Sequence, residues 1–393
     1  MKNKGFLKGM ITGAALVILL CGIVAGAFKV LDIVKYGTGN TNYSLDNNSA
    51  FDKLRVIEGI IDHNSYYDID GNRLETGIYK GLVAGLDDDY AAYLTPEENG
   101  LQSETNNGEY RGIGVTMSNK TGKGVEIQSV YEGTPAERAG IKAKDIITEA
   151  DGTDYTDKTA SALSTYIRTS DKDQVSLTLY RPSSNETIKM DVALEKIVIP
   201  TVSGSMLEGD IGYITIRNFH ALTEEQFKEK YEEMKSLGMK GVIFDLRGNP
   251  GGLVHTTLNM LDYLLPECNT LILEDRDKNR QTYGSGEGGV LDIPCVLLIN
   301  GSSASATEIF AGAMQDNGYA TVVGTTSYGK GIVQGTYPVG DGSAVKLTIA
   351  KYYTPSGRDI HKNGIKPDIE VENTEDKDLQ KEKAVEVIKS KIQ

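Results

Sequence analysis

Residues 294–334 read PCVLLINGSSASATEIFAGAMQDNGYATVVGTTSYGKGIVQ, and they combine a strand, a sharp turn and a helix. The apolar run 296–299 predicts a strand, and the apolar spacing that begins at Ile309 predicts a helix. Between them lie mostly small residues, which let the backbone bend sharply. A hydroxyl at such a turn projects from the helix start with amide N–H groups beside it. The turn is therefore a good position for a nucleophilic serine.

The second half of this stretch supplies a candidate base. Lys330 lies between Gly329 and Gly331, so its side chain can come close to a neighbouring backbone and lie against apolar walls. Burial disfavours the ammonium form and lowers the pKa of the amine, which makes it a usable general base towards serine. Gln334 can orient the amine by a hydrogen bond without adding charge. Taken alone, the two motifs have a simpler interpretation, a helix cap and a lysine in a solvated turn.

Three separate blocks of the chain resemble the carboxyl-terminal processing peptidases, which are PDZ-containing serine proteases with a Ser/Lys dyad: residues 245–252, 300–309 and 327–334. Lys330 follows Ser305 by 25 residues and Gln334 follows Lys330 by four, which are the intervals of that family. One departure is Thr307 in place of the usual serine, outside the dyad. The resemblance implies that Ser305 is the nucleophile, Lys330 the base and Gln334 its partner, with no metal or organic cofactor.

The block at 245–252 reads DLRGNPGG and follows a predicted buried strand, so it forms a second strand-to-helix junction. Its two final glycines leave amide N–H groups open, which is the arrangement needed to hold an oxyanion. By the family's spacing, the resemblance implies Gly251 as one oxyanion donor and the amide of Ala306 as the other. Asp245 and Arg247 are interpreted as a structural ion pair that braces this loop.

A histidine is the alternative to Lys330 as the base. Of the four histidines, only His255, just past the glycine pair, lies near the proposed site in sequence. A Ser/His/Asp triad with Asp245 stays open at this stage, because triads are recognised by geometry. It leaves Lys330 and Gln334 without a role, and we therefore favour the dyad.

Residues 107–197 are predicted to form a PDZ domain. The run YRGIGV that begins at Tyr110 resembles the carboxylate-binding loop, in which glycines expose backbone N–H groups to a chain terminus, and the block 133–141 follows at the expected distance. Such a groove binds by strand addition, with the peptide carboxylate in a nest of amides. The glycine run alone also fits a small β-rich domain without a ligand. Arg138 is predicted to face the protease core and to couple peptide capture to alignment of the dyad. The resemblance implies these peptide-binding residues: Arg111, Gly112, Ile113, Gly114 and Arg138.

The N-terminus predicts a membrane anchor. Lys2, Lys4 and Lys8 precede residues 9–28, which carry no charge and are long enough to span a bilayer as a helix. The lysines favour an N-terminus inside and the rest of the chain outside. Residues 25–27 (AGA) also suit a signal peptidase, so cleavage and release is the alternative.

Length and charge set the broad class. The net charge of −14 and the aromatic content of 7% argue against nucleic-acid binding, since neither a basic nor a base-stacking surface is expected. A chain of 393 residues is too long for one core, and the fold class is predicted as multidomain α+β, with a ClpP/crotonase-like α/β core implied by the resemblance. Cys268 and Cys295 are interpreted as unpaired. The predicted divisions are an anchor or uncleaved signal (1–34), a linker (35–50), an N-terminal helical segment (51–106), the PDZ domain (107–197), the serine protease core (198–374) and a C-terminal helix (375–393).

These features together predict an extracytoplasmic serine endopeptidase at the cell membrane that binds apolar C-terminal tails and cleaves near them. One alternative is a membrane-tethered PDZ scaffold on an inactive protease core, which the intact Ser305, Lys330 and Gln334 oppose. Another is an acyl-CoA hydratase-like enzyme, which shares an oxyanion loop on an α/β core but which the PDZ segment and export signal oppose. The expected partners are protein or peptide substrates with free apolar C-termini and the membrane, and a homodimer is the assembly considered.

Overall fold

The structure, a computed structural model, describes residues 47–120 and 123–392. The predicted anchor at residues 9–28 lies outside these residues. None of the helices within the described ranges is long and apolar enough to cross a membrane.

The predicted protease core is built on a six-stranded sheet in the order β10-β11-β12-β15-β16-β19. β10 and β11 are antiparallel, and the other neighbouring pairs are parallel. Every residue of β12 and β15 is buried, as expected for central parallel strands that are covered on both faces. The bounds are β10 Val202–Leu207, β11 Ile211–Ile216, β12 Gly241–Asp245, β15 Cys295–Ile299, β16 Thr321–Gly324 and β19 Ile369–Glu370.

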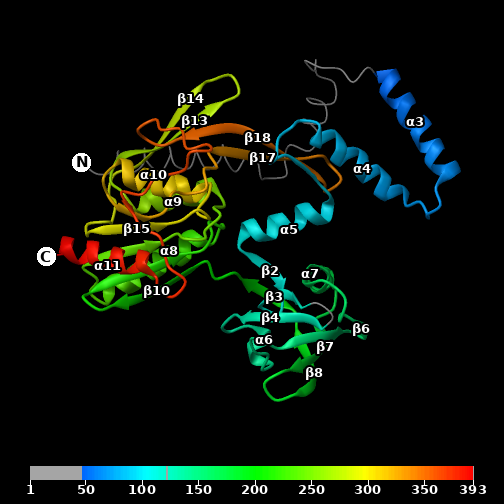
Figure 1. Cartoon of the computed structure of the whole chain (residues 1–393), viewed down its shortest axis with the longest axis horizontal. Helices are drawn as coiled ribbons and strands as arrows, with labels where there is room; N and C mark the ends of the chain where they lie inside the picture. Colours follow the sequence, from blue (N-terminus) through cyan, green and yellow to red (C-terminus); the bar gives the residue numbers. More distant parts are fainter. Residues whose placement is uncertain (1–46, 121–122, 393) are drawn as a thin grey trace, which may run out of the picture.

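Helices cover both faces of this sheet (Figure 1). On one face, three helices share a continuous apolar core with the sheet. On the other, Val296 and Leu298 pack with Ala384 and Ile388 of α11, so the predicted C-terminal helix is confirmed. The bounds are α8 Thr223–Ser236, α9 Val254–Leu264 and α10 Ala306–Asp316 on the first face and α11 Leu379–Ile392 on the second.

A second sheet lies beside the first and includes part of the N-terminal segment. Its order is β1-β18-β13-β14, and β17 also pairs with β18. The helices predicted for the N-terminal segment are confirmed as α3 Asn47–Asn64 and α4 Gly71–Ala84, and α5 Pro96–Asn107 follows. The prediction missed β1, because three residues are too few to show an alternating pattern. The bounds are β1 Ala92–Leu94, β13 Cys268–Asp275, β14 Arg280–Ser285, β17 Ile332–Pro338 and β18 Ala344–Tyr353.

The PDZ region has its own sheet and its own apolar core. The sheet order is β3-β4-β5-β7-β8, with β6 paired to β5, while β2 and β9 form a separate two-stranded ribbon. The predicted groove helix and closing strands are confirmed as α7, β7 and β8. The bounds are β2 Glu109–Gly112, β3 Val115–Lys120, β4 Gly124–Val130, α6 Pro135–Arg138, β5 Ile146–Ala150, β6 Thr153–Asp154, α7 Ala160–Thr169, β7 Gln174–Arg181, β8 Glu186–Ala193 and β9 Glu195–Val198.

Both cysteines in the described part of the chain are unpaired, as predicted. Cys295 is buried in β15, and burial raises the pKa of its thiol. Such a thiol is inert, since the thiolate is the reactive form.

Candidate active site

Ser305 lies at a strained turn between β15 and α10. It is the residue just before the helix and has φ +58° and ψ −120°, a conformation that costs a non-glycine residue about 1–3 kcal/mol. Bonds from both sides hold the turn: the Ala304 amide (3.0 Å) and the Thr307 hydroxyl (3.0 Å) both donate to the carbonyl of Asn249. The buried Ser303 hydroxyl donates to the Leu246 carbonyl at 2.8 Å and so also holds the turn. The predicted nucleophile therefore sits where neighbouring loops over-determine its backbone.

The fully buried carboxylate of Glu308 joins this turn to the loop that carries Lys330. Oε2 accepts the amide of Ser305 at 2.8 Å and the amide of Lys330 at 2.8 Å. Oε1 accepts the amide of Gly329 at 2.7 Å and the hydroxyl of Ser327 at 2.5 Å. One carboxylate thus fixes the backbones of both predicted dyad residues. The sequence analysis missed this role, although a glutamate three residues after a serine N-cap is a capping-box signal.

Tyr352 of β18 joins the same two residues a second time. Its fully buried hydroxyl lies against the carbonyl oxygens of Ser305, at 2.9 Å, and of Lys330. Burial raises the pKa of this phenol well above its usual value, so it acts as a neutral hydrogen-bonding group. Nothing in the local sequence around Tyr352 indicates this contact.

The amine of Lys330 faces the ring of Tyr90, with Nζ 4.6 Å from the ring centroid. Lys330 is half-buried; burial, together with the nearby charge of Lys346, lowers the pKa of its amine, and Glu308 opposes this effect. Within the described ranges, no hydrogen bond joins Lys330 Nζ to Ser305 Oγ. The structure therefore brings the two residues into one site through their backbones, while the amine rests on Tyr90.

Gln334 does not lie against the amine as predicted. Its Nε2 donates to Thr348 Oγ1 at 3.4 Å, and it pairs with Thr348 across β17 and β18. The register shifts between Val333 and Gln334, and such a bulge re-aims the side chains that follow it. The expected bond from Gln334 to Lys330 is thus absent among the described residues.

Gly251 and Ala306 lie together beside Ser305. A Cβ added to Gly251, which has φ +103°, would lie 2.8 Å from Ser305 Cβ and 2.9 Å from the Ala306 nitrogen. Only glycine fits this approach. However, the Gly251 amide already donates to Asn249 Oδ1 at 2.8 Å, so it is not open as predicted. An oxyanion at this position requires that bond to break.

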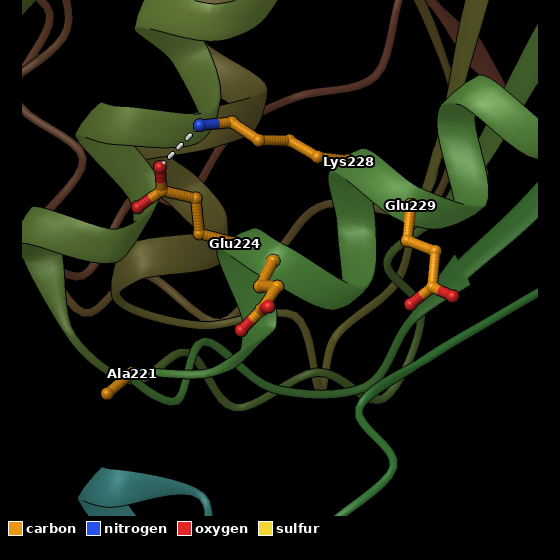
Figure 2. Close-up of a pocket in the computed structure, with 5 residues that line it drawn as sticks. Ala221, Glu224, Lys228 and Glu229 are labelled. Atoms are coloured by element: carbon orange, nitrogen blue, oxygen red, sulfur yellow. Dashed lines mark hydrogen bonds and ion pairs between the residues drawn. The ribbon is translucent and has the colours of Figure 1, made fainter.

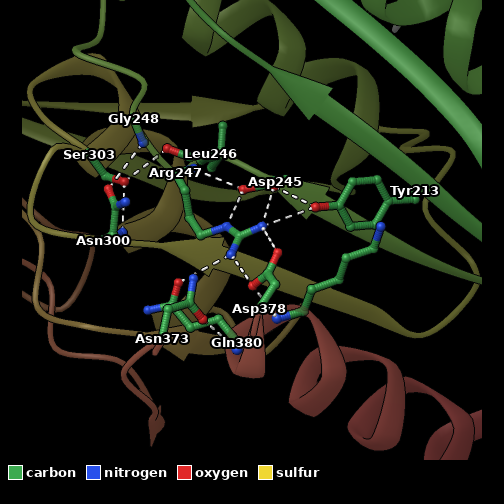
Figure 3. A network of polar contacts seen from close by, with 11 residues as sticks. Tyr213, Asp245, Leu246, Arg247, Gly248, Asn300, Ser303, Asn373, Asp378 and Gln380 are labelled. Atoms are coloured by element: carbon green, nitrogen blue, oxygen red, sulfur yellow. Dashed lines mark hydrogen bonds and ion pairs between the residues drawn. The ribbon is translucent and has the colours of Figure 1, made fainter. Parts of the chain in front are cut away.

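Arg247 braces this loop from behind (Figure 3). Its guanidinium donates to both carboxylate oxygens of Asp245, at 2.9 and 2.8 Å, which confirms the predicted ion pair. It also donates to both oxygens of Asp378, just before α11, at 2.6 and 3.0 Å. The hydrogen bond from Arg247 lowers the pKa of the Asp378 carboxyl. The C-terminal helix is therefore tied to the loop that carries Gly251.

The structure does not support the Ser/His/Asp alternative. The oxygens of Asp245 accept hydrogen bonds from Arg247 and from the Tyr213 hydroxyl (2.5 Å). No hydrogen bond between Asp245 and His255 occurs in the part of the chain that the structure describes. Burial lowers the pKa of His255, and within residues 47–120 and 123–392 no hydrogen bond joins its ring to Ser305.

Two predicted peptide-binding arginines are engaged within the PDZ domain. Arg111 donates to the carbonyls of Ser170 and Lys172, both at 2.6 Å, beyond the end of α7. Arg138 donates to the Gly133 carbonyl and to Glu195, both at 2.6 Å. No hydrogen bond or ion pair joins Arg138 to the protease core among the described residues, so the predicted coupling to the core is not seen in this conformation.

The predicted carboxylate loop is shaped by its glycines. A Cβ on Gly114, which has φ +87°, would lie 2.3 Å from Thr134 Cβ, and a Cβ on Gly112 would lie 2.5 Å from the Tyr110 ring. Between them Ile113 is buried, and its carbonyl accepts the Ala136 amide at 2.9 Å. The loop is therefore held rigidly against α6.

A separate hollow of about 650 Å³ lies along α8 (Figure 2). Glu224 pairs there with Lys228 at 2.6 Å. None of the predicted site residues lines it, and its charges fit an ordinary solvated surface. Its lining residues are Ala221, Glu224, Glu225, Lys228 and Glu229.

A serine at a strained elbow, a half-buried lysine tied to it and a PDZ domain together define the class: a PDZ-containing serine peptidase. Comparisons agree with this class. Residues 210–371 match peptidase family S41, and residues 112–192 match the PDZ domain. The chain is 32% identical over 362 residues to the carboxy-terminal processing protease CtpA of Bacillus subtilis, covering 91% of this chain and 76% of that relative.

Other relatives give the same result. The chain is 31% identical over 369 residues to a probable CtpA-like serine protease of Staphylococcus aureus strain N315, covering 92% of this chain and 72% of the relative. A solved photosystem II D1 C-terminal processing protease is similar with a TM-score of 0.49 and 27% identity, covering 81% and 86% of the two chains. The identities to the proteases of Bacillus subtilis and Staphylococcus aureus show that the chain belongs to peptidase family S41, the carboxy-terminal processing serine proteases, as its motifs predicted.

Replacing Glu308 by glutamine tests its role as the joint between the two loops. The amide NH₂ cannot accept hydrogen bonds, so about half of the four contacts are lost. We expect a loss of stability of about 1–3 kcal/mol and a fall in kcat of at least about 10-fold, with KM little changed. Thermal unfolding and steady-state kinetics measure both. The matched control is Glu386→Gln on the exposed face of α11, which should change neither. Wild-type kcat in Glu308→Gln would contradict the assignment.

Proposed function

We propose that the protein captures free, apolar C-terminal tails in its PDZ domain and cleaves a nearby peptide bond with a Ser305/Lys330 dyad. The observation that carries this proposal is the Glu308 carboxylate, which holds the backbones of both residues in one unit. The lowered pKa of the half-buried Lys330 amine adds to it, since a base must be neutral to accept a proton.

The chemistry proceeds in two steps. Ser305 Oγ attacks the carbonyl carbon while neutral Lys330 takes its proton, and the amides of Gly251 and Ala306 stabilise the oxyanion. The ammonium then returns the proton to the leaving amine as the C–N bond breaks, leaving an acyl-enzyme on Ser305. Water, deprotonated by Lys330, hydrolyses the ester and releases the shortened chain.

Two local changes precede this chemistry. The amine of Lys330 leaves the ring of Tyr90 and turns to Ser305, which its flexible stem allows while Glu308 keeps the backbone fixed. The Gly251 amide exchanges its bond with Asn249 for the oxyanion. A PDZ scaffold on a silent core remains the alternative if these changes never occur.

The activity should rise with pH, because the protonated amine of Lys330 is not a base. Its lowered pKa places the rise below the ordinary value of 10.5, and stability should increase over the window between the folded pKa and 10.5, where only the unfolded chain binds the proton. Lys346→Met removes a charge that lowers this pKa, so the rise should move to higher pH. The control Lys235→Met, on the exposed part of α8, should leave the profile unchanged.

Peptide cleavage tests the dyad and the tail requirement together. Wild type, Ser305→Ala and Lys330→Ala are compared on peptides with a free or an amidated apolar C-terminus. Each substitution should lower kcat/KM by at least about 10³-fold, and amidation should weaken binding and cleavage in wild type. Wild-type cleavage by either variant would refute the dyad, and binding of the free tail without any cleavage would favour the scaffold.

We further propose that residues 9–28 anchor the chain in the cell membrane with residues 47–392 outside the cytoplasm. The uncharged run after three lysines supports this arrangement. In intact cells, an externally added protease should degrade the body, and the full chain should sediment with membranes until detergent is added. Protection from the protease until the cells are lysed would contradict the orientation.

We also propose a homodimer that packs through α3 and α4. Ile78 and Leu82 lie one turn apart on α4, at 46% and 54% exposure, and Val56 and Ile60 on α3 are at 61% and 57%. Exposed apolar stripes of this kind mark association surfaces. Light scattering should give twice the chain mass, and Leu82→Glu should shift the protein to monomer. A wild-type monomer at all concentrations would rule this out.

A further inference from the structure

The groove between β3 and α7, where a peptide would add to the PDZ sheet, is already filled. The space that remains is about 40 Å³, enough for one or two water molecules and too small for a peptide side chain. The walls are formed by Ile113, Val115 and Met117 on one side and by Ser164, Ile167 and Arg168 on the other. The side chain of Tyr110, from β2, also lines this space.

Tyr110 reaches the groove by folding back over its own loop. Gly112 permits this fold, because a Cβ there would lie 2.5 Å from Tyr110 Cε2 and 3.0 Å from Cδ2. The guanidinium of Arg168 covers the ring, 4.5 Å from its centroid. The backbone of Tyr110 is fixed by pairing with Ile197 of β9, so only the side chain is free to turn away.

The phenolic oxygen of Tyr110 faces the amides that a terminal carboxylate would use. Burial raises the pKa of this hydroxyl to about 12, and the charge of Arg168 and the neighbouring backbone amides of Val115 and Gly114 partly oppose that rise. These amides belong to the YRGIGV loop, whose N–H groups form the nest for a chain terminus in strand addition. The neutral phenol therefore lies close to the amides that a terminal carboxylate would bind.

One hydrogen-bond donor of Arg168, its Nε, has no partner among the described residues. Its Nη1 binds Glu104 Oε2 of α5 at 3.2 Å. The Nε is also buried. A donor that is shielded from water and unpaired, beside the nest, is placed to receive an acceptor that the present conformation lacks.

We propose that Tyr110 is a built-in substitute for the carboxylate of a peptide, and that a tail binds only by displacing it and then pairing its carboxylate with the Gly114 and Val115 amides and with Arg168. The inference rests on the proposed tail binding and deepens it. A carboxylate forms stronger, charge-assisted bonds than a neutral phenol, which allows the exchange. The ring leaves an apolar space, so the selected tails end in a large apolar residue with a free carboxylate.

Peptide binding to the full chain tests this proposal, with Ser305→Ala present throughout to prevent cleavage. Fluorescence anisotropy measures labelled peptides that end in Phe, with a free or an amidated terminus. Tyr110→Phe keeps the ring and removes the competing oxygen, so displacement costs less and the free peptide should bind about 3- to 10-fold more tightly, as expected for one net hydrogen bond. The control Tyr180→Phe removes a hydroxyl that binds Asn185 in the β7–β8 turn and should not change this affinity.

Arg168→Gln should weaken the binding of the free peptide and reduce the ratio of its affinity to that of the amidated peptide. An unchanged affinity of the free peptide for Tyr110→Phe would overturn the proposal that the Tyr110 hydroxyl takes the place of the peptide carboxylate. An unchanged preference of Arg168→Gln for the free over the amidated peptide would overturn the proposed pairing of the carboxylate with Arg168. In both cases, a preference for the free terminus in the protein that carries Ser305→Ala alone would leave the proposed function intact. If that protein binds free and amidated peptides equally, tail recognition itself is overturned, and this inference with it.

Discussion

The site depends on the burial of one carboxylate. Glu308 is fully buried, and its two oxygens accept four hydrogen bonds, three of them from backbone amides. A carboxylate accepts hydrogen bonds and donates none, and its removal from water is costly unless its acceptor positions are filled. The loops that carry Ser305 and Lys330 are separated by α10 and β16 in the chain, and both must close on Glu308 to fill those positions. The placement of these two backbones is thus a condition of folding.

One continuous segment of the chain touches both places where a substrate would meet the protein. Tyr90 covers the amine of Lys330, and two residues later β1 adds to β18. Further on, Glu104 of α5 binds Arg168, and Tyr110 fills the PDZ groove. The sequence predicted residues 51–106 as a helical segment and placed Tyr110 in the PDZ domain. In the structure, residues 90–110 contact both Lys330 and the groove between β3 and α7.

Local patterns in the sequence predicted what depends on local physics. The strand-to-helix turn at Ser305, the Asp245–Arg247 pair and the apolar stripe of α11 each follow from nearby residues, and each is present. The contacts that orient side chains depend on distant segments. Tyr90 reaches Lys330 across 240 positions, and a bulge in β17, invisible in the spacing, turns Gln334 to Thr348. Motif spacing therefore predicted two residues whose backbones the fold brings together, and it did not define the contacts of their side chains.

Several groups of the candidate site have partners within the protein. The Lys330 amine lies on the face of the Tyr90 ring, the Gly251 amide donates to Asn249, and the Tyr110 side chain lines the PDZ groove. Asn249 also donates from its side chain to the Ile216 carbonyl at 2.9 Å, so releasing Gly251 breaks one bond and leaves the residue in place. A neutral hydrogen bond is worth about 1 kcal/mol net, and a bond to a charged group about 1.5–3 kcal/mol. An oxyanion therefore outcompetes Asn249 for the Gly251 amide, whereas an uncharged acceptor does not. The internal bond thus keeps the Gly251 amide paired until negative charge develops beside it.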